Sequence, residues 1–125
     1  MKNFFTRNAA LVEIKTPSTP LLGRKYRNIY NVSEDLGGSV MQVLTYRSSL
    51  QREFLGLASA IPKRLEAFEP RCVVIVGNTS EVRADPNKLA SLELYRGSCP
   101  TVAIITFDEL FAKTTRLINV LETAA

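Results

Sequence analysis

Alternating apolar and polar positions near the start of the chain predict a half-buried strand. Residues 11–15 read Leu-Val-Glu-Ile-Lys, and successive side chains of a strand point to opposite faces. Glu13 and Lys15 should therefore share one face. Val12 and Ile14 should point to the other face, which we expect to be buried. The pattern thus predicts a carboxylate and an ammonium side by side at the end of a strand.

Two further apolar runs predict strands within a sheet. Residues 72–77 (Cys-Val-Val-Ile-Val-Gly) are continuously apolar, which is typical of a central strand covered on both faces, and residues 101–106 form a second buried run. Near the N-terminus, residues 4–6 and 9–15 are expected to pair as antiparallel strands, joined by a turn at positions 7–8. The sequence therefore predicts at least four strands.

Helix-start signals divide the rest of the chain. Ser33 is a suitable N-cap for a helix over residues 34–54, whose first turn is acidic. Asp85-Pro86 opens a helix that ends near residue 95, and the capping box Thr106-Phe-Asp-Glu opens the last helix, residues 107–122. A short helix is expected over about residues 62–68. This order predicts an α/β domain with a mixed sheet flanked by helices.

The segment between the first strand and the long helix reads as a loop. Residues 16–23 contain two prolines, and the basic tract 24–27 continues them. Residues 1–32 carry six basic groups against the single acid Glu13, whereas the remainder of the chain is nearly neutral. A polyanion is expected to bind where this positive charge is concentrated. A merely soluble basic surface is the alternative that the charge alone leaves open.

Composition excludes several classes of protein and of site. The 125 residues amount to one domain of ordinary globular composition, with 46% hydrophobic and 22% charged residues. No apolar run is long enough to span a membrane, and the first residues lack the features of a signal peptide. Without histidine, neither a His-dependent nucleophile nor a His-ligated zinc site is possible. We interpret the two cysteines as reduced thiols of a cytoplasmic protein.

The long helix carries a polar ridge that could face the charged pair. Glu34, Gly38, Gln42 and Tyr46 are spaced four residues apart and so lie along one helix face. A glycine inside a helix costs about 1 kcal/mol relative to alanine. Gly38 is therefore explained either by close approach of another group or by tight packing of the helix on the sheet. Glu34 is explained equally well as a first-turn acid that favours the helix dipole.

These motifs together resemble the Shedu family of bacterial anti-phage nucleases, in its C-terminal nuclease domain of the PD-(D/E)xK superfamily. The resemblance rests on five stretches of this sequence: Val-Glu-Ile-Lys-Thr-Pro-Ser (12–18), Tyr-Asn-Val-Ser-Glu-Asp-Leu (30–36), Gly38, Gln-Val-Leu-Thr-Tyr (42–46) and Ile-Thr-Phe-Asp-Glu-Leu (105–110). It implies a restriction-endonuclease-like fold for residues 1–125 as a single domain, either a short copy or a piece of a longer protein truncated at its N-terminus.

The resemblance implies DNA cleavage that depends on Mg²⁺ or Mn²⁺. Glu13 would bind the metal, and Lys15 would steady the attacking water or the phosphate. Gln42 and Tyr46 would orient the site or contact the DNA backbone. DNA is the implied partner, and the basic residues expected to bind it are Arg24, Lys25 and Arg27. The resemblance also implies a homo-oligomer assembled through regions beyond this chain.

The sequence departs from the superfamily pattern at the second metal-binding acid. No Asp or Glu precedes Glu13. In the expected hairpin Asn3 would lie opposite Glu13 and offer only a neutral oxygen. Three interpretations follow: the acid-bearing strand lies outside this chain, the domain is inactive, or Glu34 supplies the acid. The rival function is a non-catalytic nucleic-acid-binding or assembly module, and a structural α/β domain is a third possibility.

Overall fold

The computed structural model describes residues 8–57 and 66–124. The elements are, in chain order, β1 (Asn8–Ile14), β2 (Leu22–Tyr26), β3 (Ile29–Val32), α1 (Glu34–Leu57), β4 (Glu66–Ile75), the 3-10 turn η1 (Thr79–Glu81), α2 (Pro86–Ser98), β5 (Val102–Ile105) and α3 (Phe107–Ala124). The predicted α/β class is confirmed. The expected strand at residues 4–6 lies outside the described residues. The turn expected at positions 7–8 does not include Asn8, because Asn8 is the first residue of β1.

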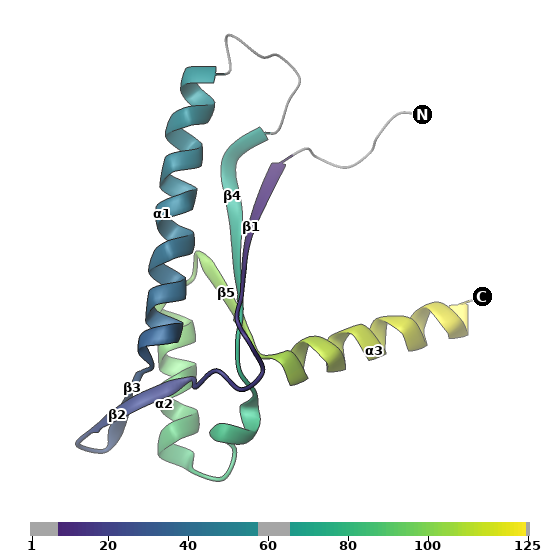
Figure 1. The fold of residues 1–125 in the computed structure, drawn as a ribbon. Helices are drawn as coiled ribbons and strands as arrows, with labels where there is room; N and C mark the ends of the chain where they lie inside the picture. Colours follow the sequence, from purple (N-terminus) through teal and green to yellow (C-terminus); the bar gives the residue numbers. More distant parts are fainter. Residues whose placement is uncertain (1–7, 58–65, 125) are drawn as a thin grey trace.

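The strands form two sheets. β1, β4 and β5 make a parallel sheet with β4 in the centre, and β2 and β3 pair as an antiparallel hairpin. In the parallel sheet, Glu13 lies opposite Val74, and Val74 lies opposite Ile104. Figure 1 shows α1 running along one side of the sheet and α3 extending away from it. α1 contacts β4 and β1, whereas α2 contacts β3 and β5.

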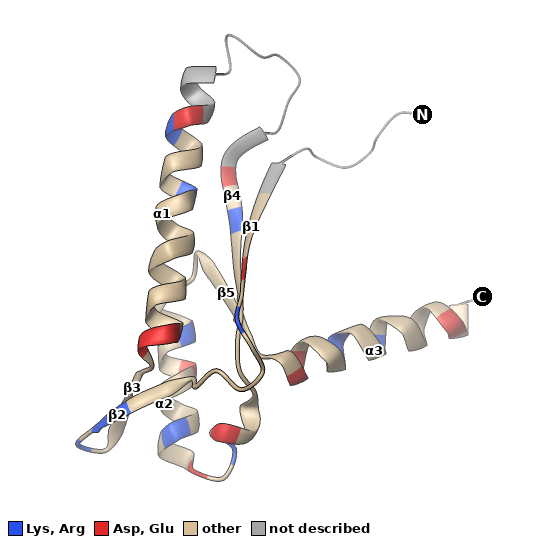
Figure 2. Ribbon diagram, in the orientation of Figure 1, with Lys and Arg blue, Asp and Glu red and all other residues tan. Residues whose placement is uncertain are grey.

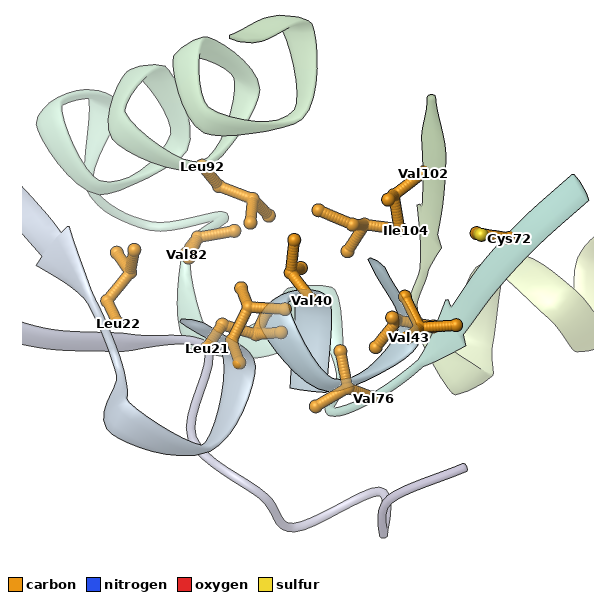
Figure 3. Packing of buried hydrophobic residues seen from close by; sticks show 12 residues of the cluster. Leu21, Leu22, Val40, Val43, Cys72, Val76, Val82, Leu92, Val102 and Ile104 are labelled. Atoms are coloured by element: carbon orange, nitrogen blue, oxygen red, sulfur yellow. The ribbon is translucent and has the colours of Figure 1, made fainter. Parts of the chain in front are cut away.

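The hydrophobic core lies between α1 and the sheet face turned toward it. Alternate residues of β4 and β5 fill it, and α2 and the loop before β2 complete it (Figure 3). Its buried members are Leu21, Leu22, Leu36, Val40, Val43, Cys72, Val74, Val76, Val82, Leu92, Val102 and Ile104. Because alternate residues of a strand face the same way, Leu11 and Glu13 of β1 lie on this inner face as well.

The predicted helix caps are confirmed. Ser33 Oγ accepts a hydrogen bond from the Leu36 amide at 3.0 Å and begins α1, and the Asp85 side chain accepts from the Asn87 amide before α2. At α3, Thr106 Oγ1 accepts from the Glu109 amide while Glu109 Oε1 accepts from the Thr106 amide, which is the expected capping box. Local sequence therefore fixes where each helix begins.

Two further predictions about the elements are wrong. Residues 16–27, read as a loop, contain β2, which pairs with β3 as a hairpin. The short helix expected over residues 62–68 does not extend to its end, because Glu66, the first residue of β4, lies opposite Asn8 of β1. Residues 62–65 lie outside the described part of the chain. Pairing with a distant strand determines the conformation here, and local sequence carries little trace of it.

Candidate functional site

Glu13 and Lys15 form a charged pair at the carboxyl end of the edge strand β1. Lys15 Nζ lies 3.8 Å from Glu13 Oε1, and the two side chains are 35% and 24% exposed. The strand continues the sheet up to this point, because the Lys15 amide donates to the Ile75 carbonyl at 2.8 Å. The prediction that both side chains share one face is confirmed. At 3.8 Å the contact is loose, so both groups remain able to bind other ligands.

The predicted burial of Val12 and Ile14 is wrong. Val12 is 51% exposed and Ile14 is 63% exposed. α1 covers the sheet face to which Glu13 belongs, and no described element buries the opposite face of β1. The charged pair thus lies at the rim of the covered face, where an edge strand leaves it open on one side. The same geometry explains why a carboxylate on this face still meets solvent.

The predicted polar ridge on α1 is present. Gln42 and Tyr46 are exposed, and Gln42 Nε2 donates a hydrogen bond to Tyr46 Oη at 2.6 Å. The ridge borders the buried side of the helix, because Ser39 and Val43 are only 1% exposed. Within the described chain, no hydrogen bond or ion pair joins this ridge to Glu13 or Lys15. The convergence of Gln42 and Tyr46 with the charged pair therefore stays a prediction.

Gly38 is not explained by packing within the described chain. A Cβ built at Gly38 would meet no atom within 4 Å, and one at Gly37 would meet only the Val32 side chain at 3.6 Å. The interpretation that Gly38 lets the helix pack tightly on the sheet is therefore wrong. Close approach of another group to Gly38 stays a prediction.

The two doubtful metal ligands stay predictions. Glu34 is exposed in the first turn of α1, where a carboxylate also favours the helix dipole. Asn3 lies outside the described residues. Residues 8–57 and 66–124 contain no group of three or more Asp, Glu, Cys or His side chains that could hold a metal ion. Of the expected metal ligands, Glu13 is the one that the structure places beside Lys15.

The loop that follows Lys15 is tied to the turn after β4. The Gly77 amide donates to the Thr16 carbonyl at 3.0 Å, and the amides of Leu21 and Leu22 donate to the Glu81 carboxylate at 2.8 and 3.0 Å. Two backbone amides that donate to the two oxygens of one carboxylate make a strong tie. Sequence reasoning missed Glu81, because its partners are 59 and 60 residues away and nothing local indicates them.

The β2–β3 hairpin presents the basic residues expected to bind nucleic acid. Arg24, Lys25 and Arg27 are all exposed, and Figure 2 shows basic positions along this hairpin. Lys25 Nζ lies 5.8 Å from the centre of the Tyr30 ring. Lys88 of α2 lies 5.3 Å from the same ring, so it joins the patch from another element. Lys88 could not be assigned from the sequence, since the helix–hairpin contact is not local.

A second charged network, centred on Asp108, holds the start of α3 in place. Asp108 accepts hydrogen bonds from the Thr79 amide at 3.0 Å and from Thr106 Oγ1 at 2.6 Å, and it pairs with Arg83 at 2.7 Å. Partial burial raises the pKa of Asp108, but the hydrogen bonds from Thr106 and Thr79 lower it more. The net result is a pKa well below the ordinary value, so this carboxylate stays ionised.

Comparison with known proteins assigns the family. The family described as Shedu protein SduA, C-terminal, matches residues 2–111. This chain belongs to that family. It is 42% identical over 127 residues to the Shedu protein SduA of Bacillus cereus (strain B4264), and the alignment covers 96% of this chain. The alignment spans 33% of that relative's length. The resemblance inferred from the Glu-x-Lys strand and the Gln-x-x-x-Tyr ridge is thus confirmed.

Proposed function

We propose that this chain is a nuclease domain that hydrolyses DNA phosphodiester bonds with the help of Mg²⁺ or Mn²⁺, in a bacterial defence protein. The observation that carries the proposal is the Glu13–Lys15 pair, open to solvent at the end of an edge strand. A carboxylate that can bind a divalent metal, with a cation beside it, suits metal-assisted hydrolysis of a phosphodiester. The Shedu C-terminal family match supports the same reading.

Glu13 fits a weakly held divalent metal. Mg²⁺ takes hard oxygen ligands and commonly keeps several waters, with only one or two protein carboxylates and the phosphates of the substrate. A 24% exposed carboxylate at the rim of a sheet can serve as such a ligand. When bound, the metal would polarise the phosphate and lower the pKa of its water.

Lys15 and the hairpin supply the positive charge that a DNA strand needs. Lys15 would bind a non-bridging phosphate oxygen and stabilise the charge that develops during hydrolysis. The exposed cations of the hairpin would bind phosphates along the backbone, which holds the strand without reading its sequence. None of Arg24, Lys25 and Arg27 makes an ion pair with a described carboxylate. All three cations are thus available to phosphates.

The second candidate is a module that binds nucleic acid or assembles a complex without cleaving. The observation favouring it is that residues 8–57 and 66–124 contain no group of three or more Asp, Glu, Cys or His side chains that could hold a metal ion. We therefore expect slow cleavage by the natural chain at best. Both candidates use the same basic hairpin, so only a cleavage assay separates them.

Plasmid nicking with Mg²⁺ and Mn²⁺ tests the proposal. Asn3→Asp should raise the rate if position 3 faces Glu13, because it restores the missing charge. In that background Glu13→Gln or Lys15→Met should reduce nicking at least about 100-fold, since one removes a ligand and the other removes the cation. Calorimetric Mn²⁺ titration provides a readout independent of turnover: Asn3→Asp should tighten binding and Glu13→Gln should weaken it.

Controls and contrary outcomes are specific. Glu34→Gln should leave nicking unchanged if Glu34 serves only the helix dipole. A loss of nicking in Glu34→Gln would instead assign Glu34 as the second acid. If Glu13→Gln nicks DNA as well as its parent, Glu13 is not a ligand and the proposed chemistry is wrong. DNA binding with no cleavage by any variant would establish the binding module instead.

A further inference from the structure

Beyond its first turn, the last helix is not covered by any other element of the described chain. α3 contains no buried residue and extends away from the sheet (Figure 1). Its direction is set at its first turn. Asp108 is held by Thr79 and Arg83, and Glu109 pairs with Arg96 at 2.7 Å. These contacts tie the first turn of α3 to residues 79–83 and to α2.

α3 carries an apolar stripe suited to helix pairing. Residues three and four apart lie on the same helix face. The large apolar side chains that share this face are Phe107, Leu110, Phe111, Leu117, Ile118 and Leu121. Phe111 is 62% exposed, and the last three are 58%, 47% and 61% exposed. A soluble helix normally buries a stripe of this kind.

The stripe is symmetric about Thr114. Phe111 and Leu117 each lie three positions from it, Leu110 and Ile118 four positions, and Phe107 and Leu121 seven positions. An antiparallel copy of the same helix would therefore present an apolar residue opposite each apolar residue. Self-complementarity of this kind is what a two-fold symmetric contact requires.

We propose that α3 pairs antiparallel with α3 of a second copy of this chain, with the two-fold axis at Thr114. Leu110 then lies opposite Ile118 of the partner, and Phe111 opposite Leu117 of the partner. The pairing is an inference about the exposed stripe of α3 and does not depend on the proposed nuclease activity.

The buried area is sufficient for such a pair. A large apolar side chain removes on the order of 80 Å² from water when fully buried. Twelve of them in a pair approach the total of about 1,000 Å² that a specific interface needs. A membrane surface is a poorer occupant, because α3 carries two cations and three anions, whereas surface-binding helices are rich in Lys and Arg.

Sedimentation of the 125-residue chain tests the pairing with matched variants. At tens of micromolar the wild type should sediment with twice the 13.9 kDa of one copy. Leu117→Asp should sediment as a monomer. Val120→Asp is the control, because Val120 is equally exposed at 61% but lies off the stripe. Neither site is buried, so both variants should keep the circular dichroism spectrum of the wild type.

Cysteine cross-linking tests the register. In a Cys99→Ser background, Thr114→Cys should form an intermolecular disulfide on mild oxidation, whereas Arg116→Cys, on the far side of the helix, should not. A mixture of Leu110→Cys and Ile118→Cys proteins should yield the mixed dimer. A monomeric wild type would overturn the proposal, as would preferential Leu110→Cys homodimers, which indicate parallel helices, or a Leu117→Asp protein that stays dimeric.

Discussion

Gly77→Ala is predicted to destabilise the domain strongly, because this residue has no room for a side chain. Gly77 has a φ of +67°, which is the left-handed region. A Cβ added there would lie 2.8 Å from both the Thr19 carbonyl oxygen and Leu21 Cδ2. The Thr19 oxygen belongs to the backbone, and Leu21 is completely buried in the core. Neither neighbour can move away without disturbing the loop that follows Lys15.

The cost has two parts. A left-handed backbone costs an alanine about 1–2 kcal/mol relative to glycine. Forcing a methyl group into a filled site adds about 1–3 kcal/mol. The free energy of unfolding should therefore fall by about 2–5 kcal/mol, a large share of the 5–15 kcal/mol that a domain typically has. The loop that carries Thr16 should shift with it, since the Gly77 amide donates to the Thr16 carbonyl.

Urea unfolding followed by circular dichroism at the helix band measures this loss. With a slope of about 1–3 kcal/mol per molar urea, the midpoint should fall by at least about 0.7 M. Gly97→Ala is the matched control, since a Cβ there meets nothing within 4 Å and should stabilise α2 by up to about 1 kcal/mol. A Gly77→Ala midpoint within 0.2 M or so of the wild type would refute the steric argument.

Two further predictions concern charge. Because the pKa of Asp108 is lower in the folded than in the unfolded chain, its stabilisation is full above about pH 4 and declines as the pH falls through the folded pKa. The difference in unfolding free energy between wild type and Asp108→Asn should therefore shrink below about pH 4 in urea titrations. The exposed Glu122→Gln is the control, and a difference that stays constant with pH would contradict the prediction. Replacing Arg24, Lys25 and Arg27 by Gln should reduce the slope of log K for DNA against log salt by up to about 3, whereas Arg116→Gln should not; an unchanged slope would show that the hairpin does not bind phosphates.

The starts of the three helices and the apolar strand segments were predictable because their signals are local. Ser33, Asp85 and Thr106 mark helix starts by chemistry that acts within one turn. The apolar run of β4 reads as a strand for a similar reason, since a central strand needs apolar side chains on consecutive positions. Such features survive in a single sequence because each depends on residues close together in the chain.

The hairpin and the exposed strand face were not predictable, because distant contacts decide both. Only Leu22 of β2 is buried, so β2 lacks the alternation that marks a strand. Its partner β3 is held by α2, because Ser91 Oγ of α2 accepts a hydrogen bond from the Tyr30 amide at 2.9 Å. In β1 the alternation was read correctly, but which face is covered depends on where α1 packs. The sequence shows that Val12 and Ile14 share an apolar face of the strand, but it does not show which face of the strand α1 covers.

The part of the site that sequence did reveal is the part written into one strand. Glu13 and Lys15 share a face because side chains two residues apart in a strand point the same way, independently of the rest of the fold. Their surroundings depend on long-range ties instead: Glu81 holds the loop after Lys15, and the same loop leads directly into the basic hairpin. A single carboxylate thus links the segment beside the charged pair to the segment expected to hold DNA. If the proposed function is right, removing the Glu81 carboxylate would weaken both DNA cleavage and DNA binding. Glu81 contacts neither metal nor substrate in that proposal.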